Sequence, residues 1–189
     1  MLDTCAALLD EMGYDRLTTT LIAERADVAI GSVYQFFPDK RAIVQALMQR
    51  NLEAYLQRLE NRFDREGLMH WSEGVDASID EYVVMHRTVP GFRALHFGDA
   101  LSVRHGTDEP DSSEIASHLA RALIDRFAVA DSAHPYLVLQ IAVTAADALI
   151  KLAFRRRAEG DEEVLAEARA LAREYLRPHL PLHRVGGDE

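Results

Sequence analysis

The stretch IAERADVAIGSVYQFF, residues 22–37, decides the architecture of the N-terminal part of this chain. It holds two short helix-like runs, separated by little more than Asp27 to Gly31. Thr18, just upstream, can cap the first run through its side-chain oxygen. Asp27 occupies the turn, where a residue must tolerate a left-handed backbone, and aspartate does so better than most residues. The pattern predicts two helices joined by a tight turn, a helix-turn-helix.

The second run has an inward and an outward side. Val33 and Phe37 are expected to pack inward, and the other side chains face solvent: Ile30, Ser32, Tyr34 and Gln35. An exposed tyrosine carries an O–H suited to a phosphate. The second helix of such a motif contacts base edges in the major groove of DNA. We therefore expect DNA contact here, and the alternative is a packed helical hairpin with a solvated outer face.

Small residues and a cation add to the DNA hypothesis. Gly31 and Ser32 are small where the second run begins, which lets the backbone approach a phosphate, and the bare N–H groups there favour an anion. Lys40, at the start of the following helix, adds a positive donor on the same side. Together these residues predict phosphate contacts beside the outer face.

The overall charge argues against non-specific binding to DNA. The chain has 189 residues and a formal net charge of −10. Residues 1–66 hold 8 Lys and Arg against 11 Asp and Glu, a net of −3, so the N-terminal part is acidic as well. Because affinity for DNA rests largely on cations that neutralise phosphates, binding must depend on where the charges point.

Helical periodicity dominates the rest of the chain, and strand signals are almost absent. We expect an all-α fold of about nine helices. Besides the two runs above, the expected helices cover residues 2–12, 39–66, 72–86, 90–97, one that opens at Asp111 or Ser112, 135–158 and 161–176. The expected domains are a helix-turn-helix head over residues 1–45 and a larger helical body over residues 46–189, which helix 39–66 connects.

Cysteine and histidine usage limits the chemistry. The single cysteine, Cys5, excludes an intramolecular disulfide framework and fits a reducing compartment. No apolar run reaches the roughly 20 residues that cross a bilayer, and acidic residues interrupt any signal-peptide layout. The expected location is the cytoplasm, with no membrane partner. Four histidines lack a carboxylate at metal-ligand spacing, so no metal or cofactor is expected: His70, His86, His96 and His105.

Residues 4 to about 47 resemble the N-terminal domain of the TetR family of transcriptional regulators. The matching pieces are Gly13-Tyr14-Asp15, Thr18, Ile22-Ala23, Gly31-Ser32-Val33-Tyr34, Phe37-Pro38-Asp39-Lys40 and Ile43. The resemblance implies a homodimeric DNA-binding protein, usually a repressor of a palindromic operator, which a small molecule releases from DNA. It implies phosphate contacts for Thr18, Thr20, Tyr34 and Lys40, and a place at or near base edges for Ala29, Ile30, Gly31, Ser32 and Gln35. Gln35 is the expected hydrogen-bonding reader, with adenine as a natural partner.

The chain departs from the family pattern at three places. Asp27 stands where the family usually has glycine, a change that the backbone argument tolerates. Ala29 stands where serine or threonine is common, which removes a helix cap worth about 1 kcal/mol. The family tends to carry a basic arm ahead of the first helix, whereas this sequence opens on Met1-Leu2-Asp3. Weaker DNA binding is expected unless the native protein begins earlier.

The last two helices are expected to form a dimer. Their apolar stripes suit a four-helix bundle made by two chains around a twofold axis, and the family resemblance implies the same. The expected interface residues are Leu137, Ile141, Ala145, Ala148, Leu152, Val164, Leu165, Ala168, Leu171, Ala172 and Tyr175. The alternative is burial of both stripes within one chain.

A ligand pocket is expected between the short middle helices and helix 135–158. Its candidate lining is mostly apolar and aromatic, which favours a hydrophobic effector of modest size. The candidates are Trp71, Tyr82, Met85, His86, Phe92, Leu95, His96, Phe97, Phe127, Thr144 and Asp147. For Asp147 the alternative is an exposed ion pair with Lys151 at i,i+4.

No feature of the sequence indicates an enzyme: there is no nucleophile–base spacing, no Gly-rich phosphate loop and no paired catalytic carboxylates. Two functions therefore remain. One is a ligand-responsive DNA-binding regulator. The other is a dimeric small-molecule-binding or protein-interaction module whose head has weak or lost DNA affinity, an alternative that Ala29 and the net charge support.

Overall fold

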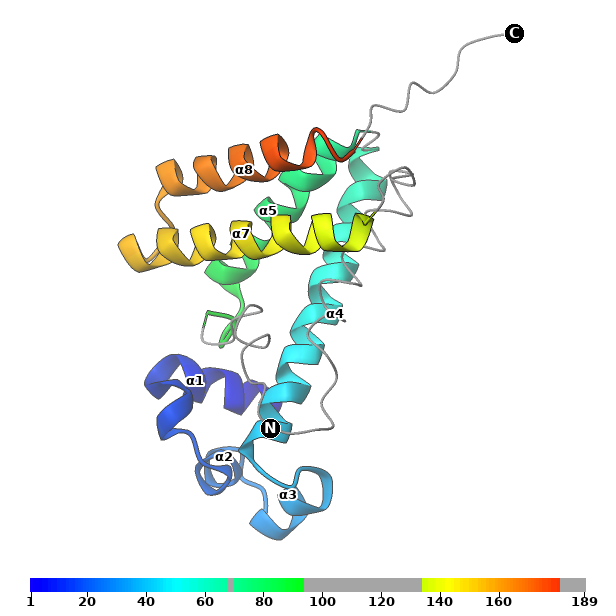
Figure 1. The fold of residues 1–189 in the computed structure, drawn as a ribbon. Helices are drawn as coiled ribbons and strands as arrows, with labels where there is room; N and C mark the ends of the chain where they lie inside the picture. Colours follow the sequence, from blue (N-terminus) through cyan, green and yellow to red (C-terminus); the bar gives the residue numbers. More distant parts are fainter. Residues whose placement is uncertain (68–69, 94–133, 181–189) are drawn as a thin grey trace, which may run out of the picture. The chain divides into compact units, whose positions relative to one another are not determined.

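The computed structural model describes residues 1–67, 70–93 and 134–180, and these residues are helical, with no strand among them (Figure 1). The helices are α1 (Leu2–Arg16), α2 (Thr19–Arg25), α3 (Ile30–Phe36), α4 (Lys40–Glu66), α5 (Trp71–Thr88), α7 (Pro135–Arg156) and α8 (Glu162–Leu176). The all-α class is confirmed, although seven helices are described where about nine were expected. The helix expected after Ser112 lies outside the described residues. The helix expected over 90–97 is a turn as far as residue 93.

The described residues form two compact units. Residues 1–57 and 84–93 belong to the first, which we call the head unit, and residues 58–67, 70–83 and 134–180 belong to the second, the body unit. The division passes through α4 and α5, so each of these helices contributes to both cores.

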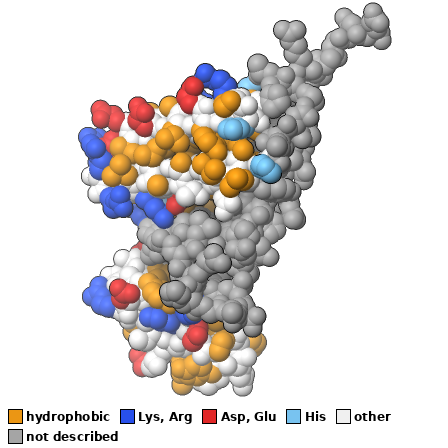
Figure 2. Space-filling view, in the orientation of Figure 1, with side chains coloured by type: hydrophobic (Ala, Val, Ile, Leu, Met, Phe, Trp, Pro, Cys, Tyr) orange, Lys and Arg blue, Asp and Glu red, His pale blue; other side chains and the backbone are white. Residues whose placement is uncertain are grey.

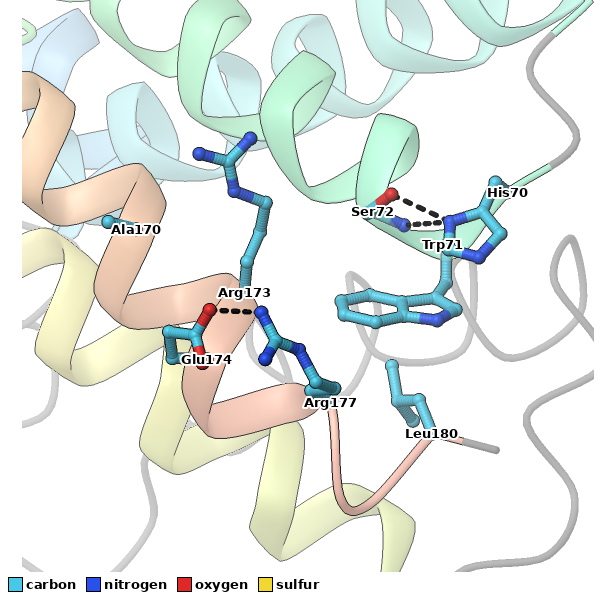
Figure 3. A pocket seen from close by; sticks show the side chains of 8 residues that line it. All are labelled: His70, Trp71, Ser72, Ala170, Arg173, Glu174, Arg177 and Leu180. Carbon is cyan, nitrogen blue, oxygen red and sulfur yellow. Dashed lines mark hydrogen bonds and ion pairs between the residues drawn. The ribbon is translucent and has the colours of Figure 1, made fainter. Parts of the chain in front are cut away.

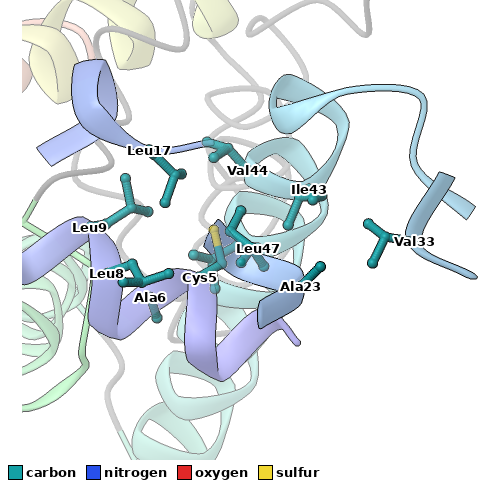
Figure 4. Close-up of a cluster of buried hydrophobic side chains, with 11 residues drawn as sticks. Cys5, Ala6, Leu8, Leu9, Leu17, Ala23, Val33, Ile43, Val44 and Leu47 are labelled. Carbon is teal, nitrogen blue, oxygen red and sulfur yellow. The ribbon is translucent and has the colours of Figure 1, made fainter. Parts of the chain in front are cut away.

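The core of the head unit is a cluster of aliphatic side chains from the first four helices (Figure 4). Leu8 and Leu9 of α1, Ile22 of α2 and Ile43 and Leu47 of α4 are at most 2% exposed. Leu8 and Leu9 lie three and four residues after the buried Cys5, and Ile43 and Leu47 are four residues apart, so each set lies on one face of its helix and directs that helix toward a common centre. Cys5 is buried in the same cluster, and burial raises the pKa of its thiol to about 11.

Local signals in the sequence set the helix ends in the head unit. Gly13 leaves the helical conformation at φ 76°, where the first helix was expected to end, although a further turn extends α1 to Arg16. Thr18 caps α2 as expected, because its Oγ1 accepts a hydrogen bond from the N–H of Leu21 at 3.1 Å. Asp39 does the same for α4, with its Oδ1 2.9 Å from the N–H of Ala42.

In the body unit, α7 and α8 form an antiparallel hairpin (Figure 1). The connection is short because Gly160 turns the chain at φ 89° and Asp161 starts α8 at once. The Asp161 side chain accepts a hydrogen bond from the N–H of Glu163 at 3.1 Å and lies 2.9 Å from Nε of Arg156. A single buried carboxylate therefore ties the end of α7 to the start of α8.

Ion pairs join α8 to α5 within the body unit. Arg169 donates to Asp80 at 2.7 and 3.0 Å, and Arg173 donates to Asp76 at 2.9 Å. Arg62 of α4 also reaches Asp80, at 3.2 Å. These contacts orient the inner face of α8 toward its own chain.

That orientation corrects part of the expected dimer interface. Leu165, Ala168 and Ala172 are at most 3% exposed and pack inside the body unit, so they are core residues of one chain. The periodicity of α8 revealed an apolar stripe but not which partner covers it. The large exposed members of the expected set remain available to a second chain: Leu137 at 53%, Ile141 at 43% and Leu171 at 42% exposure.

Part of α7, Leu137–Arg156, is long and apolar enough to cross a membrane by length and composition, among the residues that the structure describes. From the sequence we expected no apolar run of this length, because polar residues interrupt the segment. Asp147 and Lys151 lie within it, and both side chains are at most 18% exposed and paired with each other at 2.9 Å. One such helix is weak evidence for a membrane span, because the core helix of a globular protein has the same length and composition, and 39% of its apolar window is buried.

Candidate nucleic-acid interface

Two backbone hydrogen bonds close the turn between α2 and α3. The N–H of Val28 donates to the carbonyl of Ala23 at 3.0 Å, and the N–H of Asp27 donates to that of Glu24 at 3.2 Å. This pair of bonds is a Schellman motif, in which the residue after the C-cap is left-handed. Asp27 takes that position at φ 54°, as predicted. The motif holds α3 at a defined angle to α2.

The start of α3 lacks a side-chain cap. Ala29 is the N-cap residue, with φ −63° and ψ 131°, and no side chain accepts a hydrogen bond there. Its carbonyl accepts from the N–H groups of Ser32 and Val33 at 2.9 and 3.3 Å, which begins the helix. The expected loss of a cap at Ala29 is therefore present in the structure.

The two sides of α3 are the expected ones. Val33 is 2% exposed and Phe37 packs against the head core. Tyr34 is 53% exposed and Ile30 is 37% exposed, and Ser32 and Gln35 lie on the surface with them. Because α3 carries no charged residue, its outward face offers hydroxyl, amide and apolar groups alone.

Phe36 is a surface residue that sequence reasoning did not single out. It is 76% exposed at the C-terminal end of α3, although the adjacent Phe37 packs inward. The sequence prediction placed Phe37, four residues after Val33, on the inward side and made no statement about Phe36. The difference arises because α3 ends at Phe36 and the backbone becomes extended at Phe37.

Lys40 is held by the head unit itself. Its Nζ donates to the carbonyls of Tyr14 at 3.2 Å and Leu17 at 3.1 Å, and lies 4.4 Å from the centre of the Tyr14 ring. Two of its three N–H donors are thus used to join α4 to the end of α1. The phosphate contact expected for Lys40 stays a prediction, and the structure adds a second, structural role.

The other expected DNA-contacting residues lie on the same unit. Thr18 and Thr20 are exposed at the start of α2, while Thr19 between them is 8% exposed. Gly31 is exposed, and a Cβ built on it would meet no atom within 4 Å. The structure therefore presents both threonines and the outer residues of α3 to solvent from one compact head.

A cavity of about 610 Å³ lies in the body unit between the start of α5 and the C-terminal half of α8 (Figure 3). It is lined by His70, Trp71, Ser72, Ala170, Arg173, Glu174, Arg177 and Leu180. Figure 3 shows the indole of Trp71 beside Leu180, with Arg177 on the neighbouring turn. The lining pairs an aromatic face with two guanidinium groups, each of which is bonded to an acidic residue.

Of the predicted pocket residues that the structure describes, Trp71 lines this cavity. Tyr82 and Asp147 are bonded to each other instead, with the hydroxyl donating to Oδ1 at 2.9 Å. Asp147 does pair with Lys151, but it is 8% exposed rather than on the surface. Thr144 is exposed and donates to the carbonyl of Gln140 in its own helix at 2.8 Å.

Three other candidates are core residues of the head unit. Met85, His86 and Phe92 are at most 4% exposed, and the rings of His86 and Phe92 meet edge to face at 4.9 Å. Leu95, His96, Phe97 and Phe127 lie outside the described residues. Within the described ranges, no three His, Cys, Asp or Glu side chains gather to hold a metal ion.

Two protein-family models match the chain, one in its N-terminal part and one in its C-terminal part. The model described as bacterial regulatory proteins, tetR family, matches residues 1–47. A second, described as tetracyclin repressor-like, C-terminal domain, matches residues 69–180. The chain is also similar to the solved structure of a TetR-family transcriptional regulator from Streptomyces coelicolor. That similarity has a TM-score of 0.82 and 40% identity, and covers 95% of this chain and 96% of that one.

Two curated relatives share shorter stretches. The HTH-type transcriptional repressor KstR of Mycolicibacterium smegmatis is 34% identical over 68 residues, 36% of this chain and 31% of KstR. The HTH-type transcriptional regulator HbdR of Aromatoleum sp. is 30% identical over 105 residues, 50% of this chain and 45% of HbdR. The chain thus spans less than half the length of these relatives.

The Schellman turn and the outward face of α3 are those of a helix-turn-helix. Both lie within residues 1–47, which the N-terminal family model matches. The C-terminal model by itself matches more than half of the chain. This chain belongs to the TetR family of bacterial regulatory proteins.

Proposed function

We propose that the protein is a ligand-responsive transcriptional regulator, most simply a repressor. It binds a palindromic operator as a homodimer and leaves the operator when a small, largely hydrophobic effector binds. Its place of action is the cytoplasm, where the DNA is, and no catalytic step is assigned to it. Membership of the family and the names of the relatives support this proposal.

One observation carries the DNA-binding part. The turn at Asp27 presents α3 with Tyr34 and Gln35 on its exposed side, while Val33 is buried against the head core. A helix-turn-helix of this kind places its second helix in the major groove. In this pose the Tyr34 hydroxyl donates to a phosphate, and the Gln35 amide faces base edges, where adenine is its natural bidentate partner.

The exposed side of α7 and α8 supports a dimer. Leu137 and Ile141 are four residues apart on α7 and more than two-fifths exposed, and Leu171 of α8 is exposed to a similar degree. Figure 2 shows a band of hydrophobic side chains over these two helices. Two such helices from each chain make a four-helix bundle around a twofold axis, which is how a symmetric protein matches a palindrome.

The effector site is proposed for the body unit. The cavity beside Trp71 has a volume of about 610 Å³, within the range typical of small-molecule pockets. An apolar, ring-containing molecule would stack on the indole and lie against Leu180. We propose this class of effector, and binding is tested by quenching of Trp71 fluorescence, since Trp71 is the one tryptophan of the chain.

The first experiment is selection of the purified protein against a pool of random duplexes over several rounds at moderate salt. Enrichment of a palindrome is the expected result and supplies the operator for effector screens. If a folded dimer with its full native N-terminus enriches no duplex, the regulator proposal is wrong.

Two variants separate phosphate contact from base contact. Tyr34→Phe removes one hydroxyl and should weaken binding to every duplex by a similar factor. Gln35→Ala should instead relax the preference at one base position of each half-site, at about 1–3 kcal/mol of discrimination. A uniform loss of affinity in Gln35→Ala would contradict its base-reading role.

A second candidate function is a dimeric ligand-binding or protein-interaction module with little DNA affinity. The observation in its favour is that Lys40 is engaged by the carbonyls of Tyr14 and Leu17, while α3 has no charge of its own. Binding to DNA that steepens as salt falls, and that depends on Tyr34, would exclude this module.

A further inference from the structure

The residues that lead into α3 form an apolar edge, which we define as Val28, Ala29 and Ile30. Val28 is 41% exposed, Ile30 is 37% exposed, and Ala29 is exposed between them. Gly31 follows and adds no side chain. Four successive residues at the leading end of the helix therefore carry no hydrogen-bonding side chain, whereas Ser32 and Gln35 come later.

The apolar edge is not part of the hydrophobic core of the head unit. Val33 already fills the inward position of α3, at 2% exposure, and Phe37 packs behind it. Exposed aliphatic side chains gain free energy only when a partner covers them, at about 25 cal/mol per Å². A helix-turn-helix places the entry to its second helix at the major groove, so DNA is the partner expected to cover this edge.

The major groove offers one apolar feature for such an edge to cover. The edges of guanine, adenine and cytosine present donors and acceptors, whereas thymine adds a C5-methyl group. Aliphatic side chains without donors or acceptors can favour a base only through that methyl group.

We propose that the apolar edge determines operator specificity by packing Ile30, flanked by Val28, against a thymine C5-methyl in each half-site. This inference rests on the proposed function and deepens it: the operator must hold a thymine at the position that the start of α3 covers. Hydrogen-bond readout by Gln35 and methyl readout by Ile30 then act at different base pairs.

The test replaces single thymines of the selected operator by deoxyuridine, which removes the C5-methyl and nothing else. At one thymine per half-site, the loss of one buried methyl should weaken binding by about fourfold, and by roughly fifteenfold when both half-sites are changed. With Ile30→Ala this difference between thymine and uracil should disappear at that position. Ile30→Val, which keeps a branched aliphatic side chain, should retain most of it.

Phe36→Ala is the matched control, because it truncates another exposed apolar residue of α3 at the opposite end of the helix. It should affect thymine and uracil operators equally. Equal binding of all uracil-substituted operators by the unaltered protein would overturn the proposal, as would an unchanged uracil penalty in Ile30→Ala. Failure to select any palindrome is a different result, which would overturn the regulator function itself. Thermal unfolding of each variant shows that the head is intact.

Discussion

At the scale of single residues, Asp27 shows how the turn tolerates a residue other than glycine. Its backbone is left-handed at φ 54°, and its N–H and that of Val28 satisfy carbonyls at the end of α2. Aspartate adopts this conformation at a smaller cost than most residues with a Cβ, and a β-branched side chain adopts it poorly.

We therefore predict that Asp27→Val lowers the free energy of unfolding by about 1–2 kcal/mol, whereas Asp27→Gly is neutral or slightly stabilising. The measurement is urea unfolding followed by circular dichroism. Equal destabilisation by glycine and valine would mean that the Asp27 side chain, and not the backbone conformation, matters at this position.

Gly91 is the other position where backbone geometry selects the residue. It has φ 73°, and a Cβ added to it would lie 2.7 Å from Cα and 2.9 Å from the carbonyl oxygen of Ala6. Its N–H donates to Asp10 of α1 at 2.7 Å. The end of α5 thus meets the backbone of α1 within the head unit, at a distance that excludes any side chain.

Gly91→Ala should lower the free energy of unfolding by about 2–3 kcal/mol, because both the close approach and the positive φ oppose a Cβ. Gly31→Ala is the matched control. A Cβ there meets nothing within 4 Å, and glycine in a helix is disfavoured relative to alanine, so this variant should be neutral or stabilising. Thermal unfolding of the two variants side by side makes the comparison, and similar stabilities would contradict the contact with Ala6.

At the scale of elements, the α7–α8 hairpin depends on Asp161. Burial acts to raise the pKa of this carboxyl, but the guanidinium of Arg156, the N–H groups of Val164 and Glu163, and the guanidinium of Arg157 outweigh burial. The pKa of Asp161 is therefore held below its ordinary value of 3.8. A carboxylate with a lowered pKa stabilises the folded state above the unfolded-state pKa, and this stabilisation is lost as pH falls through the folded-state pKa.

Asp161→Ala should consequently lower the melting temperature at pH 7, and the difference from the unaltered protein should shrink as pH falls below about 3.8. Asp161→Ser keeps an oxygen that can cap α8 but removes the charge, so its deficit should be smaller than that of Asp161→Ala at every pH. This deficit should shrink over the same acid range, because only the unaltered protein carries the carboxylate. Calorimetry of the three proteins across the acid range is the measurement. A deficit of Asp161→Ala that stays constant with pH would show that the cap alone matters.

At the scale of the whole molecule, the exposed stripe of α7 and α8 is the surface that we assign to the dimer. Aliphatic side chains on this stripe include Leu137, Ile141 and Leu171. A carboxylate placed there on each chain would meet its own copy across the twofold axis, or be buried without a partner, and both are unfavourable.

Ile141→Glu should therefore convert the dimer into a monomer in light scattering and abolish tight binding to the palindrome. Ala54→Glu adds the same charge at an exposed position of α4 and should leave the mass unchanged. If Ile141→Glu remains a dimer, the interface lies elsewhere on the chain.

The sequence by itself determined the features that depend on local interactions. Helical periodicity, the cap at Thr18, the left-handed turn at Asp27 and the missing cap at Ala29 all involve residues within a few positions of one another, so they can be deduced without the fold. The outward face of α3 followed from the same periodicity.

Tertiary structure decided the features that depend on contacts between helices far apart in the sequence. Lys40, for which a phosphate contact is predicted, also donates to carbonyls at the end of α1, 23 and 26 residues away in the sequence. Leu165 and Leu171 belong to the same apolar stripe of α8, yet one is buried in the chain and the other is 42% exposed. Asp147 is bonded to Tyr82, 65 residues earlier. Periodicity shows that a face is apolar or polar, and only the packing of distant helices selects its partner.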